Sequence, residues 1–154
     1  MTVRALSKIA ACAVLFVLSA CGGGHSPSEP EAPPTADSLT LVRVDPAATT
    51  VLRQGTQVTV RARLRYAMAR STQGVITAFV LGSGGTGPGI IPTTGFPFAI
   101  VTGNRGEVEL PVAFTIPAGT TSLNIQIFFD PDVDDGNPNN DGDTSLDISY
   151  SAGP

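Results

Sequence analysis

The chain has 154 residues, of which 42% are hydrophobic and 14% charged, with 17 Gly, 13 Pro, no Trp and a formal net charge of −4. This length suits a single domain, and the acidic balance argues against nucleic acid as a partner. His25, Lys8, Cys12 and Cys21 are all of its His, Lys and Cys, too few for a catalytic triad, a Cys-His pair, a Schiff base or His-ligated zinc, so we expect no enzyme.

The first predicted element is an export signal over residues 1–20. Arg4 and Lys8 give it a basic start, and residues 9–18 (IAACAVLFVL) form an unbroken apolar run. A run of about ten residues has the length of a signal-peptide core. A transmembrane helix needs about twenty. The sequence therefore predicts export rather than a spanning helix.

The signal ends in the motif Leu18-Ser19-Ala20-Cys21. An aliphatic residue, two small residues and a Cys resemble the lipobox of bacterial lipoproteins. The resemblance implies that a signal peptidase recognises Leu18, Ser19 and Ala20, cleaves before Cys21 and leaves a covalent lipid, with acyl chains such as palmitate, on Cys21. It also implies a membrane-attached protein of the cell envelope, and Gly22 favours the outer membrane over the inner one. The alternative is an ordinary secretory signal with an unmodified Cys21.

Residues 21–37 are predicted to be the lipidated Cys and a flexible tether. Residues 22–37 (GGGHSPSEPEAPPTAD) hold Gly, Pro, Ser and acidic residues and almost nothing to bury. His25 lies here, where a solvated side chain is favoured over a metal ligand. Cleavage after Ala20 would leave 7 Arg against 13 acidic residues, a net charge of −6, and one Cys that has no partner for a disulfide.

Residues 38–154 are predicted to form one all-β domain. Apolar residues recur there with period two, and Gly, Pro, Asn or Asp interrupt them roughly every 10 to 15 residues. The strands that we expect are 39–44, 57–68, 75–81, an irregular pair around 90–91 and 96–101, 107–116, 123–129 and 146–150. A count of about seven strands suits an immunoglobulin-like sandwich.

Two segments near the start of this domain, residues 42–46 (VRVDP) and 55–60 (GTQVTV), resemble the corresponding part of many bacterial surface Ig-like domains. The resemblance implies a single Ig-like or fibronectin-like antiparallel β-sandwich. It also implies that the second and fifth strands are neighbours.

The polar face of strand 57–68 carries Arg61, Arg63 and Arg65. Pairing of the second and fifth strands would set them opposite Glu107 and Glu109, where cross-strand pairs stabilise a sheet. We therefore expect structural ion pairs. The alternative is binding of an anionic surface such as lipopolysaccharide or phospholipid headgroups, which an acidic mature chain disfavours.

Residues 82–87 (GSGGTG) match the string G-x-G-x-x-G after an apolar strand. A dinucleotide site needs a helix N-terminus that faces the pyrophosphate, and Pro88, Gly89 and Pro92 prevent such a helix. We expect a loop at the edge of the sandwich instead.

Residues 130–143 (DPDVDDGNPNNDGD) are the candidate cation site because they offer many hard oxygen ligands, which Ca²⁺ prefers. They resemble calcium loops in general, although neither EF-hand register is complete, since Asp135 takes the place of a Gly and Ile148 that of the last acid. The predicted calcium ligands are Asp130, Asp132, Asp134, Asp141 and Asp143. The alternative is a solvated acidic loop whose Asx and Gly residues form turns.

Aromatic residues give little sign of a carbohydrate platform. Both tyrosines, and five phenylalanines, lie in the apolar phase of a strand or in apolar runs: Tyr66, Tyr150, Phe79, Phe96, Phe98, Phe114 and Phe129. Phe128 remains as the one ring that the pattern leaves exposed.

The sequence thus predicts a lipid-anchored, non-catalytic binding or scaffolding module of the cell envelope, with an envelope protein as its partner and no nucleic acid. The alternative is a calcium-responsive adhesion or assembly domain that uses the loop 130–143. A remote alternative is a hydrolase that uses two carboxylates.

Overall fold

The computed structural model describes residues 31–84, 88–132 and 144–154, which contain strands and no helix. The strands are β1 (Ser38–Asp45), β2 (Leu52–Arg53), β3 (Gln57–Ala67), β4 (Gln73–Gly84), β5 (Gly89–Ile91), β6 (Phe98–Thr102), β7 (Arg105–Thr115), β8 (Thr120–Asp130) and β9 (Thr144–Gly153). The described residues accordingly offer no long apolar helix that would cross a membrane. The prediction of an all-β fold is confirmed.

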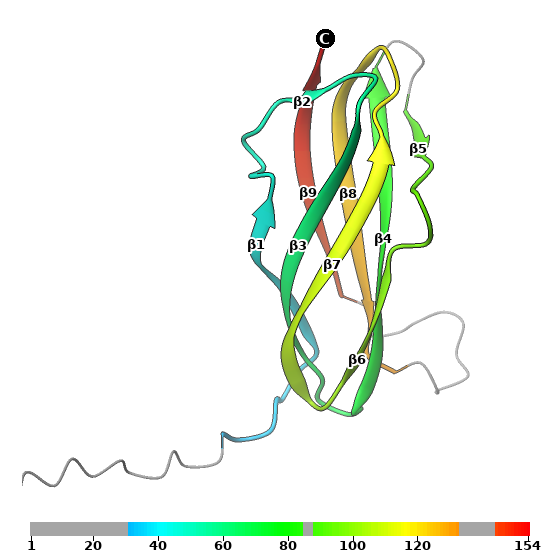
Figure 1. The fold of residues 1–154 in the computed structure, drawn as a ribbon. Coiled ribbons are helices and arrows are strands. Elements are labelled where there is room, and N and C mark those ends of the chain that lie inside the picture. The colour runs from blue at the N-terminus through cyan, green and yellow to red at the C-terminus, as the bar shows by residue number, and fades with distance from the viewer. Residues whose placement is uncertain (1–30, 85–87, 133–143) are drawn as a thin grey trace, which may run out of the picture. The chain divides into compact units, whose positions relative to one another are not determined.

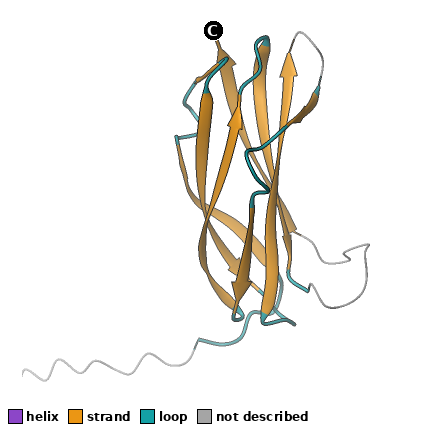
Figure 2. Cartoon of the chain, turned by 45° about the vertical axis from the view of Figure 1, so that its right-hand side comes forward, coloured by secondary structure: helices purple, strands orange, loops and turns teal. Residues whose placement is uncertain are grey.

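The strands form two sheets that pack face to face (Figure 1). The smaller sheet has the order β1-β3-β7, and the larger sheet has the order β2-β9-β8-β4-β5, with β6 pairing β4. Figure 2 shows the two layers from a second direction, with strands along the whole length of both. The predicted sandwich is confirmed. The two-residue β2 is the strand that the sequence pattern misses, and its pairing with β9 is parallel rather than antiparallel.

Period-two alternation places one apolar face of each long strand between the sheets. On β3, β7 and β8, the residues predicted to point inward are buried or partly buried. The largest fully buried side chains are Phe114, Phe129, Leu64, Met68, Ile76, Leu110, Ile116, Leu123, Ile125, Ile127, Val60 and Val80. The core is therefore drawn from both sheets.

Two tyrosines bury their rings and give their hydroxyl groups backbone partners. The Tyr66 hydroxyl donates to the Thr102 carbonyl at 2.7 Å, and the Tyr150 hydroxyl donates to the Pro46 carbonyl at 2.8 Å. Burial, with a smaller contribution from the Asp45 carboxylate, raises the pKa of Tyr150 to about 12. The Tyr150 bond ties the larger sheet to the segment that follows β1.

β4 organises the larger sheet because it has partners on both edges. One edge pairs with β8, while the other pairs with β6 along its first half and with β5 near its end. Between β5 and β6 the chain turns away from β4, where Thr93 forms an isolated bridge with Phe114 of β7. It then returns, and the Ala78 amide donates to the Pro97 carbonyl at 3.1 Å. The two short strands β5 and β6 and the segment between them therefore lie along the same edge of β4.

Candidate functional site

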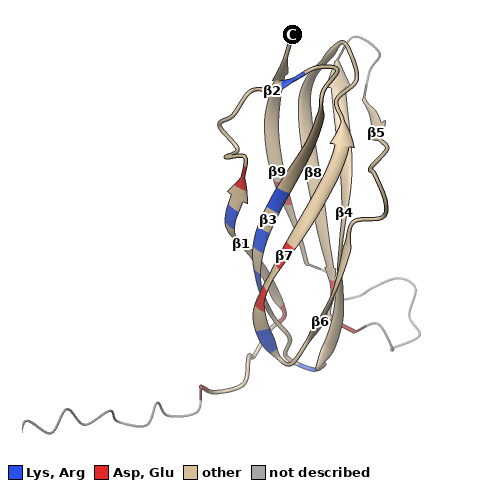
Figure 3. Ribbon diagram, viewed as in Figure 1, with Lys and Arg blue, Asp and Glu red and all other residues tan. Residues whose placement is uncertain are grey.

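The outer face of the smaller sheet carries the predicted arginine row. β3 and β7 are neighbours, and Arg63 and Arg65 lie opposite Glu109 and Glu107 in the register. The ion pairs join Arg61 Nη1 to Glu109 Oε1 at 3.0 Å, Arg63 Nη2 to Glu107 Oε2 at 2.8 Å and Arg65 Nη2 to Glu107 Oε1 at 2.6 Å. Figure 3 shows the blue residues of β3 beside the red residues of β7. The expected cross-strand pairing is confirmed, and we call these five residues the charged face.

Glu107 is the centre of the charged face because two guanidinium groups share its carboxylate. The hydrogen bond from Arg65 is the main cause that holds the pKa of Glu107 below its usual value. Burial opposes it, and the hydrogen bond from Arg63 and the charges of both arginines lower the pKa further. Hollows on this face are lined by both signs of charge. Each of the three arginines therefore forms an ion pair within the chain, and the two glutamates compensate two of the three positive charges.

The outer face of the larger sheet differs because it is apolar where β4, β5 and β6 meet. Phe79 is 41% exposed, Phe96 63%, Phe98 54%, Ile90 71% and Ile100 58%. The half-buried Phe128 of β8 adjoins them. We call this surface the aromatic face, composed of Phe79, Ile90, Phe96, Phe98, Ile100 and Phe128.

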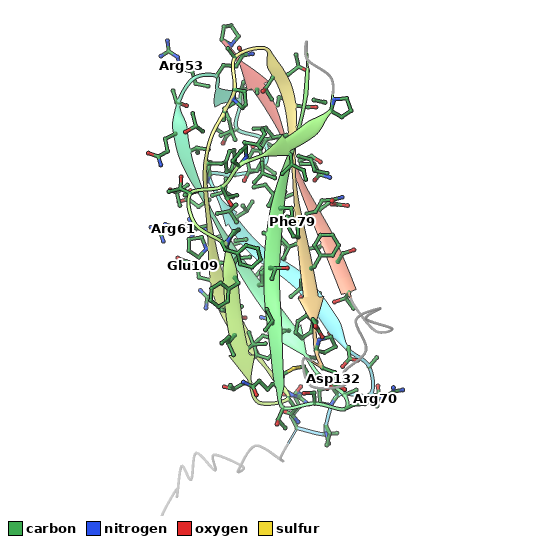
Figure 4. The ribbon with its side chains drawn as sticks, turned by 90° about the vertical axis from the view of Figure 1, so that its right-hand side faces the viewer. Arg53, Arg61, Arg70, Phe79, Glu109 and Asp132 are labelled. Atoms are coloured by element: carbon green, nitrogen blue, oxygen red, sulfur yellow. The ribbon has the colours of Figure 1, made fainter. Side chains whose placement is uncertain are left out.

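The four rings form a connected series across the strands. Ring centroids are 5.9 Å apart for Phe128 and Phe79, 6.5 Å for Phe79 and Phe96, and 6.1 Å for Phe96 and Phe98. The register explains why they share a face, since Thr77 of β4 lies opposite both Phe98 of β6 and Phe128 of β8. Figure 4 looks onto this side of the molecule, with Phe79 on β4 near the centre. The rings support one another and remain open to solvent.

Three of the four strands that form the aromatic face, β4, β5 and β6, carry no charge. The sequences of β4 (QGVITAFVLGSG), β5 (GII) and β6 (FAIVT) hold no Asp, Glu, Lys or Arg, and Figure 3 shows β5 and β6 without blue or red. On the outward positions of β8 and β9, the acidic residues are Asp130 and Asp147. Recognition at this face must therefore rest on apolar contact rather than on charge.

The exposure of these rings corrects the sequence-based expectation. Phe79, Phe96 and Phe98 lie in apolar runs, and the pattern leaves Phe128 as the exposed ring. In the structure the first three are exposed and Phe128 is half-buried. A signal existed in the segment that leads into β6, where positions 96, 98 and 100 hold Phe, Phe and Ile and the residues between them are smaller.

The predicted calcium ligands fall into two groups. Asp130 and Asp132 are described, and the Asp132 amide donates to Asp130 Oδ1 at 3.0 Å. Asp134, Asp141 and Asp143 lie outside the described residues. In the part of the chain that the structure describes, no three His, Cys, Asp or Glu side chains come together as a metal site. The calcium site stays a prediction.

The glycine string has a packing role at the two positions that matter here. A Cβ on Gly82 would lie 2.7 Å from Ile91 Cδ1, and a Cβ on Gly84 would meet the Gly119 carbonyl oxygen. Residues 85–87 lie outside the described residues, and the chain resumes as strand β5 where a dinucleotide site requires a helix. The close approach of Ile91 of β5 explains Gly82, and that of the turn before β8 explains Gly84.

The predicted processing site lies outside the described residues. This holds for Leu18, Ser19, Ala20 and Cys21, and also for His25 of the tether. The lipid anchor therefore stays a prediction from the sequence.

The strand arrangement of this chain is similar to that of two solved structures. No family model matches the chain, and no curated protein matches it. A PapD-like domain of human CEP192, its PapD-like domain 7, has a TM-score of 0.41 and 11% identity, over 80% of this chain and 89% of that chain. AvmM, which catalyses macrocyclization in alchivemycin A biosynthesis, has a TM-score of 0.34 and 9% identity, over 79% of this chain and 92% of its own. The chain is similar to both in its strand arrangement alone.

Proposed function

We propose that this chain is a lipid-anchored, non-catalytic module of the bacterial cell envelope, held by Cys21 and binding through the aromatic face. The observation that carries the binding role is the uncovered apolar surface on β4, β5 and β6. Taking about 200 Å² for a whole Phe side chain, the exposed parts of Phe79, Phe96 and Phe98 alone amount to roughly 300 Å². The largest apolar patch on a typical monomer is about 300–600 Å² and is often functional.

The non-catalytic part of the proposal draws support from the state of the carboxylates. Glu107 and Glu109 are bound by arginines on an open sheet face, and the pKa of Glu107 is lowered rather than raised. A general acid needs a carboxyl group whose pKa is raised towards neutrality. These two residues are therefore suited to ion pairing rather than to proton transfer.

The anchor is tested by the mass and the partitioning of the chain produced in a Gram-negative host. We expect a product that lacks residues 1–20 and carries acyl chains, and that enters the detergent phase on phase separation. Cys21→Ser should remove the added mass and the detergent partitioning. The matched control is Cys12→Ser, which changes the other Cys and should leave both properties intact. A wild-type chain without added acyl mass would disprove the anchor.

The binding role is tested by photo-crosslinking in the same cells. A photoreactive phenylalanine analogue at position 98 should give adducts with envelope components. The same analogue at Thr59, an exposed residue on the outer side of β3, should give few. Equal labelling from both positions would argue against a specific role of the aromatic face.

A further inference from the structure

We propose that the aromatic face docks on the surface of the lipid bilayer, so that the domain lies against the membrane with β4, β5 and β6 towards the lipid. This inference rests on the proposed function, since the lipid on Cys21 is what holds the domain near a membrane. It goes further because it identifies the occupant of the face. The proposal is argued from the area of the face, its charge and the place where the chain enters the domain.

The area of the face suits a membrane better than a second protein. A stable protein–protein interface buries about 800 Å² of polar and apolar surface on each partner. The exposed parts of Phe79, Phe96 and Phe98 provide roughly 300 Å², and Ile90 and Ile100 add the exposed parts of two smaller side chains. A face of this size needs a second attachment to stay occupied. The lipid on Cys21 supplies that attachment, because tethering turns docking into an intramolecular step with a high effective concentration.

The chain enters the domain at one end of the sandwich, through β1 of the smaller sheet, and β6 of the aromatic face ends at the same end. β1 begins at Ser38, which pairs with Ala67, and Ala67 pairs in turn with Arg105. β6 ends at Thr102, three residues before Arg105, so the start of β1 and the end of β6 lie at the same end of the sandwich (Figure 1). Sixteen residues separate Cys21 from Ser38, and their covalent geometry limits the span to about 60 Å. The face therefore stays within reach of the bilayer that holds the lipid.

The charge distribution decides which bilayer the face prefers. Attraction to anionic headgroups comes from Lys and Arg beside the membrane. β4, β5 and β6 have neither. The exposed Arg70 in the turn before β4 is outnumbered by the outward acids of β8 and β9, Asp130 and Asp147, which anionic lipid would repel. We expect docking on zwitterionic phosphatidylcholine to be at least as strong as on vesicles that contain phosphatidylglycerol, and to depend little on salt.

The absence of Trp from the chain allows a direct test. Phe98→Trp places one fluorophore on the aromatic face, and Thr59→Trp places one on the outer side of β3 as the matched control. Both lipid-anchored proteins are reconstituted into phosphatidylcholine vesicles whose acyl chains carry bromine, which quenches Trp on contact. We expect several-fold stronger quenching and a blue-shifted emission for Trp at position 98, compared with position 59.

A second pair of variants separates docking from folding. Phe96→Ser added to Phe98→Trp should reduce the quenching, because it removes the neighbouring exposed ring. Val51→Ser, also added to Phe98→Trp, changes an equally exposed apolar residue (64%, against 63% for Phe96) outside the aromatic face and should leave the quenching unchanged. Circular dichroism verifies that both variants keep their strands.

Three results would overturn the proposal. The first is equal quenching at positions 98 and 59, or none at either. The second is a blue shift at position 98 that appears without vesicles and grows with protein concentration, which would assign the face to a second copy of the chain. The third is crosslinking from position 98 to a protein with no quenching by lipid. Acyl mass on Cys21 is measured in the same samples, so loss of the anchor is distinguished from failure of docking.

Discussion

The two outer faces of the sandwich differ in whether their side chains find partners within the chain. On the charged face, each of the three arginines has a glutamate within 3.0 Å. On the aromatic face, the rings contact one another but keep between 41% and 63% of their area open in Phe79, Phe96 and Phe98. The arginines of the charged face are ion-paired, whereas the rings of the aromatic face keep apolar area in contact with solvent. The conspicuous charges are therefore paired within the chain, whereas the uncharged strands carry apolar side chains that stay exposed.

The largest expected effect contrasts a ring beneath the larger sheet with a ring upon it. Phe129 is fully buried, and Phe98 is 54% exposed. Phe129→Ala should reduce the free energy of unfolding by about 3–5 kcal/mol, since it leaves a cavity in the core. Phe98→Ala should cost less than about 1 kcal/mol. Urea unfolding of both variants checks the difference, and similar losses would mean that the aromatic face serves stability.

A smaller effect is expected at Tyr150, which supports both faces by tying the two layers together. Tyr150→Phe removes the hydrogen bond to the Pro46 carbonyl, which contributes about 1 kcal/mol. Because folding raises the pKa of Tyr150 to about 12, its hydroxyl adds stability that is complete below the unfolded pKa of 10.0 and is lost as pH rises from there towards 12. The free energy of unfolding should therefore fall less steeply from neutral to alkaline pH in the variant than in the wild type. An unchanged alkaline slope would contradict this role.

The charged face should respond more weakly, and to acid and salt rather than to alkali. Folding lowers the pKa of Glu107, so its ion pairs add stability that is present above the usual carboxyl pKa and is lost as pH falls through the lowered value. Glu107→Gln should flatten that acid loss and reduce the salt dependence of unfolding, with little change in stability at neutral pH because the pairs are exposed. Melting curves at several pH and salt values test this. A large loss of unfolding free energy at neutral pH would show that the ion pairs of the charged face stabilise the fold more than we expect.

The smallest expected effect concerns calcium. Asp130 and Asp132 are joined by a local hydrogen bond, and the other three predicted ligands lie outside the described residues. A solvated acidic loop would give equal melting midpoints in millimolar Ca²⁺ and in EDTA. A calcium concentration of about one hundred times the dissociation constant would instead stabilise the fold by roughly 2.7 kcal/mol. A higher midpoint with Ca²⁺ that Asp132→Asn abolishes would favour the calcium-responsive alternative.

Strands with one apolar face could be predicted from the sequence because the alternation determines which face is buried. β3, β7 and β8 have their buried residues where alternation puts them, and the pairing of Arg65 with Glu107 was also foreseen. β4 and β6 are different because both of their phases are apolar. Which phase meets solvent depends on whether a third layer covers the sheet, and a domain of this size builds two layers. Alternation of residue size at positions 96–100 marks the phase of β6, but it does not show that this phase faces solvent.

The uncharged strands at the edge of the larger sheet affect the tendency of this chain to aggregate. β6 pairs with β4 alone among the described strands, and neither strand has a Lys or other charge to discourage a foreign strand. Sheet edges of this kind promote aggregation unless charge or a covering segment blocks them. A newly made chain is therefore exposed to self-association until something occupies that side. Aggregation of the chain, and not only its affinity for a partner, therefore depends on the uncharged β6 and on its exposed Phe98 and Ile100.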